Sequence, residues 1–388
     1  MSNIHKFLIH QTYRYIFFYR NDICHFEAIR ILYFCTNSIK MSKFNPLKVK
    51  EIRKETPLAV SIVFDIPAEL KDDYTFEAGQ YVNIKAQING EEVRRSYSIS
   101  SSPLSGELRI VVKAIDGGTF SNYATQNLEV GNTLDVAIPE GKFTLENKNA
   151  KVIAGIAAGS GITPIISIAK DVLESSNDTT FVLIYGNKTV EDTIYHNEIE
   201  TLKNKYLGRF FVHYTFTKVH PDGSLFGRIE RSTINFVFKN KHSEKEFDSY
   251  FLCGPEDMIT KVTNVLKENG VTEEQINYEL FTTSATNGEI PVTGEGMVKV
   301  TVLVDDVETT FNMPRTENIL SAALKHGVDA PYSCQGGICS SCMCKTVAGK
   351  AEMKTNHILM DDEIEEGMLL ACQAYVTTDE IYVDFDDV

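Results

Sequence analysis

The sequence predicts a multidomain protein with an antiparallel β-barrel, an α/β doubly wound domain and a small C-terminal α+β domain. Residues 44–145 contain short β-patterned runs separated by turn residues, which is typical of a barrel. From Lys151 onward, strand-like and helix-like runs alternate, which indicates a parallel sheet. A small, polar stretch then precedes a segment with four cysteines spaced C-x4-C-x2-C and a fourth far downstream. The length of 388 residues fits two or three domains.

The domain boundaries are predicted from these changes of pattern. We expect an extension at residues 1–40, a barrel at 41–147, the α/β domain at 148–282, a linker at 283–296 and the C-terminal domain at 297–388. The extension is rich in Tyr and Phe, and we expect it to result from an upstream start codon, with Met41 as the true first residue. A membrane-surface or targeting segment is the alternative.

Charge and composition exclude some classes of function. The net charge of −15 argues against a nucleic-acid surface, and no apolar run is long enough for a transmembrane segment. Acidic residues outnumber basic ones in 297–388, which either steers this end toward a basic partner or simply solvates it. The cysteines outside the four-residue pattern show no disulfide framework, so we expect a cytoplasmic, reducing location.

The barrel segment contains Arg95-Ser96-Tyr97-Ser98, which resembles the R-x-Y-[ST] flavin motif of the ferredoxin–NADP reductase superfamily. The resemblance implies that Arg95 neutralises a flavin phosphate, that Tyr97 packs on the isoalloxazine ring, and that Ser98 acts near its reactive nitrogen. A four-residue motif alone also fits an ordinary barrel strand. Residues 139–143, Pro-Glu-Gly-Lys-Phe, resemble the segment that closes the flavin barrel in this family.

A second segment supports the flavin interpretation. It resembles the family's pyrophosphate-binding loop, in which backbone N–H groups and hydroxyls meet the anion. The residues it implies as cofactor contacts are Gly117, Gly118, Thr119 and Ser121. FAD is expected rather than FMN on the resemblance alone.

The α/β domain carries a glycine loop directly after its first strand. The loop has the form G-x-G-x-x-P, with Gly159, Gly161, Thr163 and Pro164 as the candidate contacts. A strand-to-helix junction suits a pyrophosphate because free N–H groups and the helix dipole face the anion. A lone glycine loop is weak evidence, but the superfamily uses this proline-bearing version.

Two later segments complete the resemblance in this domain. Cys253, Gly254 and Pro255 match the C-G-P motif that lies beside the nicotinamide, although a buried strand cysteine is the alternative for Cys253. Glu279 and Phe281 match the terminal acidic–aromatic segment near the flavin, although the aromatic ring also fits a core position. The candidate catalytic residues are therefore Ser98, Cys253 and Glu279.

The sequence gives some indication of whether NADPH or NADH is preferred. The second strand of the α/β domain is followed by Asn187 and Lys188, without the carboxylate that often binds the 2′-hydroxyl of NAD. Thr217 and Lys218 end the third strand, where the family often contacts a 2′-phosphate. These residues favour NADPH. If both lysines are only solvated surface residues, NADH is possible.

The metal candidates are Cys334, Cys339, Cys342 and Cys372, whose spacing is the plant-type pattern for a [2Fe–2S] cluster. Cys339 and Cys342 alone also fit half of a zinc site, but Cys372 has no close second cysteine. Cys344 falls outside the spacing and is expected to be a bystander. Residues 297–388 resemble plant-type ferredoxins, which implies a β-grasp fold.

The resemblance covers residues 44–388 and implies an NAD(P)H-dependent oxidoreductase. Electrons would pass from NADPH through FAD and the cluster to a protein acceptor. The resemblance is strongest to reductases serving phenylacetyl-CoA epoxidases, and related reductases of other oxygenases and of acyl-chain desaturases share the order of domains. A reductase for a fatty-acyl desaturase or a Rieske-type oxygenase is the alternative. A flavin enzyme acting alone and a redox sensor are further possibilities from other classes.

Overall fold

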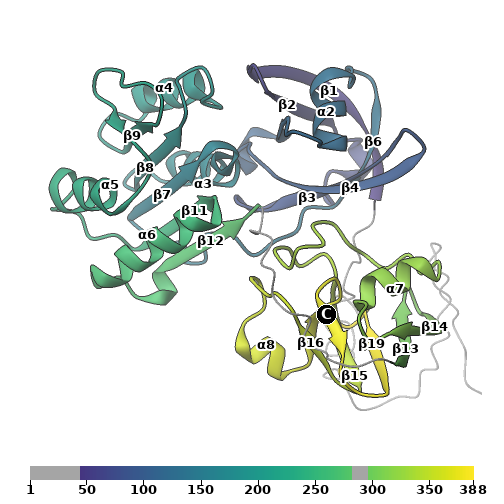
Figure 1. The fold of residues 1–388 in the computed structure, drawn as a ribbon. Helices are drawn as coiled ribbons and strands as arrows, with labels where there is room; N and C mark the ends of the chain where they lie inside the picture. The colour runs from purple at the N-terminus through teal and green to yellow at the C-terminus, as the bar shows by residue number, and fades with distance from the viewer. Residues whose placement is uncertain (1–43, 282–295) are drawn as a thin grey trace, which may run out of the picture. The chain divides into compact units, whose positions relative to one another are not determined.

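The computed structural model describes residues 44–281 and 296–388 (Figure 1). The predicted extension at 1–40 and all but the last residue of the predicted linker at 283–296 lie outside these residues. The domains described below belong to one compact unit, Met41–Val388. No helix within the described residues is long and apolar enough to cross a membrane.

The first domain is a curled six-stranded antiparallel sheet with the strand order β4-β3-β6-β1-β2-β5. An isolated bridge between Ile99 and Ile110 brings its two edges together, so the predicted barrel is confirmed. Asn89 and Gly90 both have positive φ in the tight turn between β3 and β4. Its elements are β1 Phe44–Thr56, β2 Ala59–Asp65, β3 Tyr81–Ile88, β4 Glu91–Ser98, β5 Leu108–Lys113, α2 Thr119–Gln126 and β6 Thr133–Ala137, with short 3₁₀ turns at Ala68–Leu70 and Pro103–Ser105.

The second domain is a parallel sheet with the strand order β10-β9-β8-β7-β11-β12, which confirms the predicted doubly wound fold. Its elements are β7 Val152–Ala158, a 3₁₀ turn Gly159–Gly161, α3 Ile162–Ser175, β8 Thr180–Asn187, α4 His196–Lys205, β9 Phe210–Phe216, β10 Leu225–Phe226, α5 Arg231–Asn235, a π-helix Phe236–Lys241, β11 Ser249–Gly254, α6 Glu256–Glu268, a 3₁₀ turn Glu273–Gln275 and β12 Ile276–Leu280.

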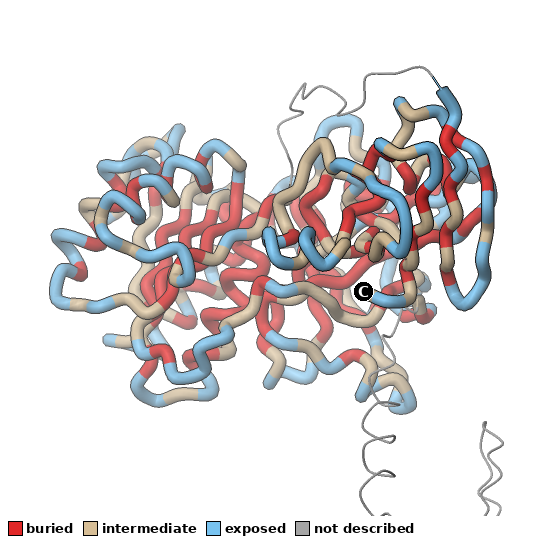
Figure 2. Tube along the Cα trace, turned by 90° about the horizontal axis from the view of Figure 1, so that it is seen from below, coloured by how far each residue is buried: buried red, intermediate tan, exposed pale blue. Residues whose placement is uncertain are grey.

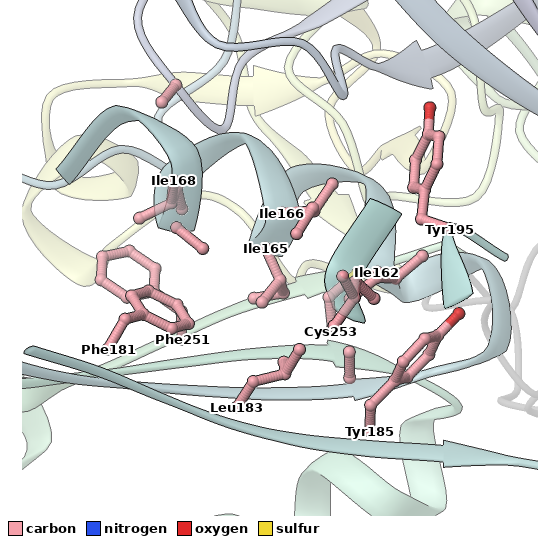
Figure 3. Close-up of a cluster of buried hydrophobic side chains, with 14 of the residues drawn as sticks. Ile162, Ile165, Ile166, Ile168, Phe181, Leu183, Tyr185, Tyr195, Phe251 and Cys253 are labelled. Carbon is pink, nitrogen blue, oxygen red and sulfur yellow. The ribbon is translucent and has the colours of Figure 1, made fainter. Parts of the chain in front are cut away.

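The central strands of this sheet are apolar on both faces because helices cover both. Phe181 and Leu183 of β8 pack in one hydrophobic cluster with α3 and α4, whereas Val182 and Ile184 pack in another with α5 and α6. Figure 3 shows the first cluster beneath α3, and Figure 2 shows buried residues running along the strands. This two-sided burial is typical of parallel sheets.

The strand order places the nucleotide-binding edge. The chain leaves β7 toward β8 on one side of the sheet and returns to β11 on the other, so β7 and β11 flank the topological switch point. Ligands of open α/β sheets bind beyond the carboxyl ends of the strands at this point. The turn after β7 is Gly159–Gly161, and β11 ends at Gly254, which Pro255 follows.

The C-terminal domain has a five-stranded sheet with the order β14-β13-β19-β15-β17, in which only the β13–β19 pair is parallel. Asp305 and Asp306 both have positive φ in the turn between β13 and β14. This arrangement agrees with the predicted β-grasp fold. Its elements are β13 Met297–Val304, β14 Val307–Pro314, α7 Ile319–Lys325, β15 Met343–Ala348, β16 Ala351–Met353, α8 Asp361–Glu365, β17 Met368–Leu370, β18 Ala374–Val376 and β19 Glu380–Asp384.

Candidate functional site

Two cavities lie along the line where the barrel meets the α/β domain. The first, of about 770 Å³, is lined by the flavin-motif strand and by the ends of β5 and β12. The second, of about 690 Å³, lies over the carboxyl ends of the parallel strands. The two share the same wall residues, namely Lys113, Ile115, Ser160 and Phe281. Ligands in the two cavities would therefore meet at this wall.

The flavin-motif residues Arg95, Ser96, Tyr97 and Ser98 all line the first cavity. All four residues lie on β4. Arg95 is exposed whereas its neighbour Arg94 is buried, because successive residues of a strand face opposite sides of the sheet. The ring of Tyr97 packs 5.5 Å from that of Phe120, measured between centroids. The motif thus offers one cation, one aromatic face and two hydroxyls to the cavity.

Ser98 and Glu279 are joined across the cavity wall. The Ser98 hydroxyl donates a hydrogen bond to Glu279 Oε2 at 3.0 Å. Glu279 lies on β12, half-buried, and desolvation raises its pKa to about 8 although the bond from Ser98 opposes this. At neutral pH the carboxyl is therefore largely protonated and can donate a hydrogen bond into the cavity.

The loop at 115–121 closes on itself next to the same cavity. The backbone N–H of Ile115 donates to Ser121 Oγ at 3.4 Å, so this hydroxyl holds the loop. A side chain at position 118 would meet Ser121 Oγ at 2.3 Å, which explains the glycine there. Gly117, with φ of 69°, Gly118, Thr119 and Ser121 all line the cavity at the start of α2. Their backbone suits an anion such as a pyrophosphate.

The glycine loop after β7 approaches the end of β11 closely. A Cβ atom at Gly161 would lie 2.1 Å from the carbonyl oxygen of Cys253, so no other residue fits without a shift. Gly159 has φ of 57°, and its carbonyl accepts a hydrogen bond from Tyr185 Oη at 3.0 Å. Thr163 lines the first cavity, and its hydroxyl donates to the Ser160 carbonyl at 3.0 Å. These contacts leave the loop backbone facing the cavities.

The structure does not bring every predicted residue to a cavity. Gly254 and Pro255 line the second cavity, but Cys253 lines neither. Its side chain is fully buried in the cluster beneath α3 (Figure 3), where burial and the neighbouring Glu279 raise the pKa of the thiol. Pro164 is likewise buried in the first turn of α3, where a missing N–H costs nothing.

The second cavity contains the residues predicted to select the nucleotide. Asn187, Lys188, Thr217 and Lys218 all line it. Within residues 44–281 and 296–388 the buried Asn187 Nδ2 atom meets no acceptor at hydrogen-bond geometry, although the side chain lies near Tyr185, so this amide fits a polar group of a ligand. Backbone hydrogen bonds from Thr217 to Asn187 and from Lys218 to Lys188 hold these two strand ends side by side.

Sequence reasoning missed Lys113, at the end of β5. It lines both cavities, and no carboxylate of residues 44–281 or 296–388 lies within ion-pair distance of it. Burial lowers the pKa of its ammonium group. Its position immediately before the 115–121 loop was the one available signal. Asp192 is the carboxylate whose charge acts on Lys113, from beyond ion-pair distance, so the ammonium group between the two cavities fits an anionic ligand.

The four candidate cluster ligands come together as two pairs. The Cys339 thiol donates to Cys334 Sγ at 3.1 Å, and the Gly336 N–H donates to the same sulfur at 3.3 Å, so the pKa of Cys334 is lowered. Cys342 and Cys372 share a hydrogen bond that lowers the pKa of Cys372. In the described residues, no three His, Cys, Asp or Glu side chains converge on one metal position. Two pairs suit two irons, each with two protein sulfurs, better than one zinc ion.

The cluster loop also borders the first cavity, because Cys334 and Cys339 are part of its lining. Cys344 is fully buried in the core of the C-terminal domain, apart from these pairs. Gly337, with φ of 73°, packs against the Thr355 carbonyl, where a Cβ would lie at 2.7 Å. The loop is thus held in shape by tight backbone packing.

Comparison with known proteins identifies the family. Residues 46–145 match the family described as "Oxidoreductase FAD-binding domain", 156–264 match "Oxidoreductase NAD-binding domain", and 302–377 match "2Fe-2S iron-sulfur cluster binding domain". The chain is 38% identical over 354 residues to a subunit of the 1,2-phenylacetyl-CoA epoxidase of Escherichia coli (strain K12), covering 89% of this chain and 99% of that protein. The chain belongs to the ferredoxin–NADP reductase superfamily, in the branch with a C-terminal [2Fe–2S] domain.

Two further proteins match over most of their length. The ferredoxin reductase component of 3-ketosteroid-9-alpha-monooxygenase from Rhodococcus rhodochrous is 31% identical, covering 87% of this chain and 96% of that protein. The fold of phthalate dioxygenase reductase matches with a TM-score of 0.57 at 23% identity, covering 88% of this chain and 98% of that one. The predicted oxidoreductase class and the predicted FAD, [2Fe–2S] and pyridine-nucleotide cofactors of this reductase are confirmed.

Proposed function

We propose that this reductase takes electrons from NADPH and delivers them to a protein oxygenase partner, with a phenylacetyl-CoA epoxidase as the first candidate. The proposal rests on the spatial order of three adjacent sites: the nucleotide cavity, the flavin cavity and the cluster loop. The nucleotide cavity shares a wall with the flavin cavity, and Cys334 and Cys339 of the cluster loop line the flavin cavity. When bound, FAD and the [2Fe–2S] cluster supply the conversion of an electron pair into single electrons.

The residues proposed to hold the flavin are those lining the first cavity. We assign Arg95 and the 117–121 loop to the phosphates of the flavin. Tyr97 would pack its ring on the isoalloxazine ring, and Ser98 and Glu279 would offer hydrogen bonds beside it. In the second cavity we assign the glycine loop at 159–161 to the pyrophosphate and residues 254–255 to the nicotinamide side. A role for Cys253 there acts through its backbone carbonyl packing on Gly161.

The preference for NADPH rests on the charge of the second cavity. Its basic lining residues Lys113, Lys188, Lys218, Arg228 and Lys261 outnumber its acidic ones, Asp192, Glu230 and Asp257. Asp257 is shared between Arg228 and Lys261, at 3.6 Å and 3.7 Å. A phosphomonoester would gain charge-assisted hydrogen bonds from such a surface. Initial rates with NADPH and NADH test this preference, and a lower KM for NADH would contradict it.

The oxygenase partner is inferred from the relatives, whose names place them in such systems. We also propose a cytoplasmic location, since the six cysteines within the described residues are all free thiols. Reconstitution with a phenylacetyl-CoA epoxidase, a Rieske-type oxygenase and a desaturase would identify the acceptor. Turnover only with the epoxidase is expected, and turnover only with another acceptor would reassign the partner.

The electron path is tested by a pair of cysteine variants. Cys339→Ser should abolish reduction of cytochrome c by NADPH but leave reduction of a dye at the flavin, because only the exit through the cluster is lost. Cys344→Ser is the matched control, since Cys344 is buried outside both sulfur pairs and should retain both activities. Survival of both activities in Cys339→Ser would refute the path.

A further inference from the structure

Asn83 occupies an unusual position on the barrel. Its neighbours Val82 and Ile84 on β3 point into the barrel core, so Asn83 is on the outer face of the sheet. An outer-face asparagine is normally solvated, yet Asn83 is 1% exposed. The cover is the cluster loop of the C-terminal domain, more than two hundred residues later in the chain.

The side-chain amide of Asn83 joins the flavin motif to the cluster loop. Its Oδ1 accepts a hydrogen bond from the Ser96 hydroxyl at 2.8 Å. Its Nδ2 donates to Ser341 Oγ at 3.0 Å and to Glu140 Oε1 at 2.5 Å. Ser96 belongs to the flavin motif, and Ser341 lies between the candidate ligands Cys339 and Cys342.

Neighbouring contacts extend this junction. The hydroxyls of Ser96 and Ser333 lie 2.6 Å apart, and Ser333 directly precedes Cys334. Because the Ser96 hydrogen is donated to Asn83, Ser333 is the donor in this second bond. The Tyr81 hydroxyl lies 3.2 Å from Ser340 Oγ, and Ser341 donates to Glu140 at 3.2 Å. Both ends of the cluster loop are therefore held against the strands β3 and β4.

We propose that Asn83 is a positioning residue that fixes the cluster loop against the flavin-motif strand, so that electron transfer from flavin to cluster depends on it whereas reduction of the flavin by the nucleotide does not. In this step one electron leaves the reduced flavin and one enters the oxidised cluster. Neither aspartate nor alanine can replace the amide without loss. An aspartate has no N–H to donate and would face Glu140 as a second carboxylate, whereas alanine leaves Ser96, Ser341 and Glu140 without their shared partner.

The inference rests on the electron path proposed above, which wild-type protein tests by itself. Rapid mixing of NADPH with the holoprotein measures flavin bleaching and cluster reduction as separate phases. Asn83→Asp and Asn83→Ala should leave the first phase within about twofold and slow the second about tenfold or more, since the docked arrangement loses several buried hydrogen bonds. Absence of a second phase in wild type would instead refute the path itself.

Hydrogen–deuterium exchange gives a readout independent of turnover. The amides of residues 333–342 should exchange faster in both variants. Asn45→Ala is the matched control, because Asn45 is also buried in the barrel and, among the described residues, its amide donates to Tyr74 Oη of the barrel, at 3.3 Å, and to no residue of 333–342. It should change neither the second phase nor the exchange of 333–342.

A second pair of variants covers the case in which changes at Asn83 prevent flavin binding. Ser341→Ala removes the cluster-loop partner, whereas Ser341→Thr retains the hydroxyl and should rescue the rate of cluster reduction. Wild-type rates of cluster reduction in Ser341→Ala, or an equal slowing in Asn45→Ala, would overturn the proposal.

Discussion

The hydroxyl of Ser98 donates to the carboxyl of Glu279 at 3.0 Å, and this bond joins the flavin-motif strand of the barrel to the last strand of the α/β domain. The two residues are far apart in the sequence, yet they form one polar wall of the flavin cavity. Burial keeps the carboxyl largely protonated, with its pKa at about 8. The Glu279 carboxyl in this wall therefore ionises near pH 8, well above the range in which most carboxyl groups do.

This shift predicts a pH-dependent stability difference between wild type and Glu279→Gln. Because the folded pKa of about 8 lies above the ordinary value of 4.5, wild type loses stability relative to the variant as the pH rises through that interval, and the difference is constant above it. Urea midpoints at several pH values between about 4 and 9 measure it. Glu129→Gln, at an exposed turn, is the control, and a flat difference for Glu279→Gln would contradict the prediction.

Gly161→Ala should destabilise the α/β domain and impair nucleotide binding together. The added Cβ would lie 2.1 Å from the Cys253 carbonyl oxygen, so the loop or β11 must move, at a cost of about 1–3 kcal/mol. Thermal unfolding and the KM for NADPH check this. Gly223 has positive φ but has open space around it, so Gly223→Ala is the control. This variant should lower the free energy of unfolding by only about 1–2 kcal/mol and leave the KM for NADPH unchanged. An unchanged KM in Gly161→Ala would argue against the loop as the pyrophosphate site.

The interface between the barrel and the α/β domain contains a buried ion cluster. Arg109 donates two hydrogen bonds to Glu198, at 3.1 and 3.2 Å, and Lys170 pairs with the same carboxylate while donating to the Ser100 carbonyl. Burial disfavours the ionised carboxylate, but the two cations outweigh it and lower the pKa of Glu198. This carboxylate is therefore a stabilising anion at neutral pH.

Glu198→Gln should cost about 3–5 kcal/mol, because it removes the anion paired with buried Lys170 and the closer of the two carboxylates beside buried Arg109, the other being Glu107 at 3.6 Å. Since the folded pKa is lowered, the stability from Glu198 is present above its ordinary value of 4.5 and is lost as the pH falls through the folded pKa, so the variant should lack this acid-dependent loss. Urea unfolding at neutral and acid pH measures both effects. The exposed pair of Glu268 with Arg231 provides the control, and Glu268→Gln should leave the urea midpoint close to that of wild type at both pH values.

Lys113→Met should weaken the binding of anionic ligands in both cavities. Loss of one charge-assisted hydrogen bond is worth about 1.5–3 kcal/mol, which corresponds to about tenfold or more in the dissociation constant. Flavin retention on dilution and titration with NADP⁺ check the two cavities separately. Lys48→Met, at an exposed position of β1, is the control. Equal affinities in Lys113→Met and wild type would show that Lys113 contacts neither ligand.

The strands and glycine loops could be predicted from the sequence because their signals are local. The apolar run at Tyr250–Cys253 predicts the strand observed at Ser249–Gly254, and Gly159-Ser-Gly161 predicts the turn that follows β7. The pattern did not show that Cys253 points into the core while the residues after it line the cavity. That difference depends on which face of β11 is covered by α3.

The contacts between domains could not be predicted in this way. The C-terminal domain helps to bury Asn83 and Arg94. Arg94 donates to Asp329 at 2.7 Å, and its guanidinium lies 4.7 Å from the Tyr332 ring centre. In the sequence Arg94 is one more polar residue beside the flavin motif. Lys113 was missed for a related reason, since its importance comes from two cavities that exist only in the fold.

The wall shared by the two cavities makes their ligands thermodynamically linked. If filling one cavity shifts Lys113 or Phe281, the affinity of the other cavity changes, and the effect must be equal in both directions. An oxidised nucleotide that slows the loss of flavin would thus itself be held more tightly by the flavin-loaded protein than by the flavin-free one. The flavin is then an effector of nucleotide affinity as well as a redox centre.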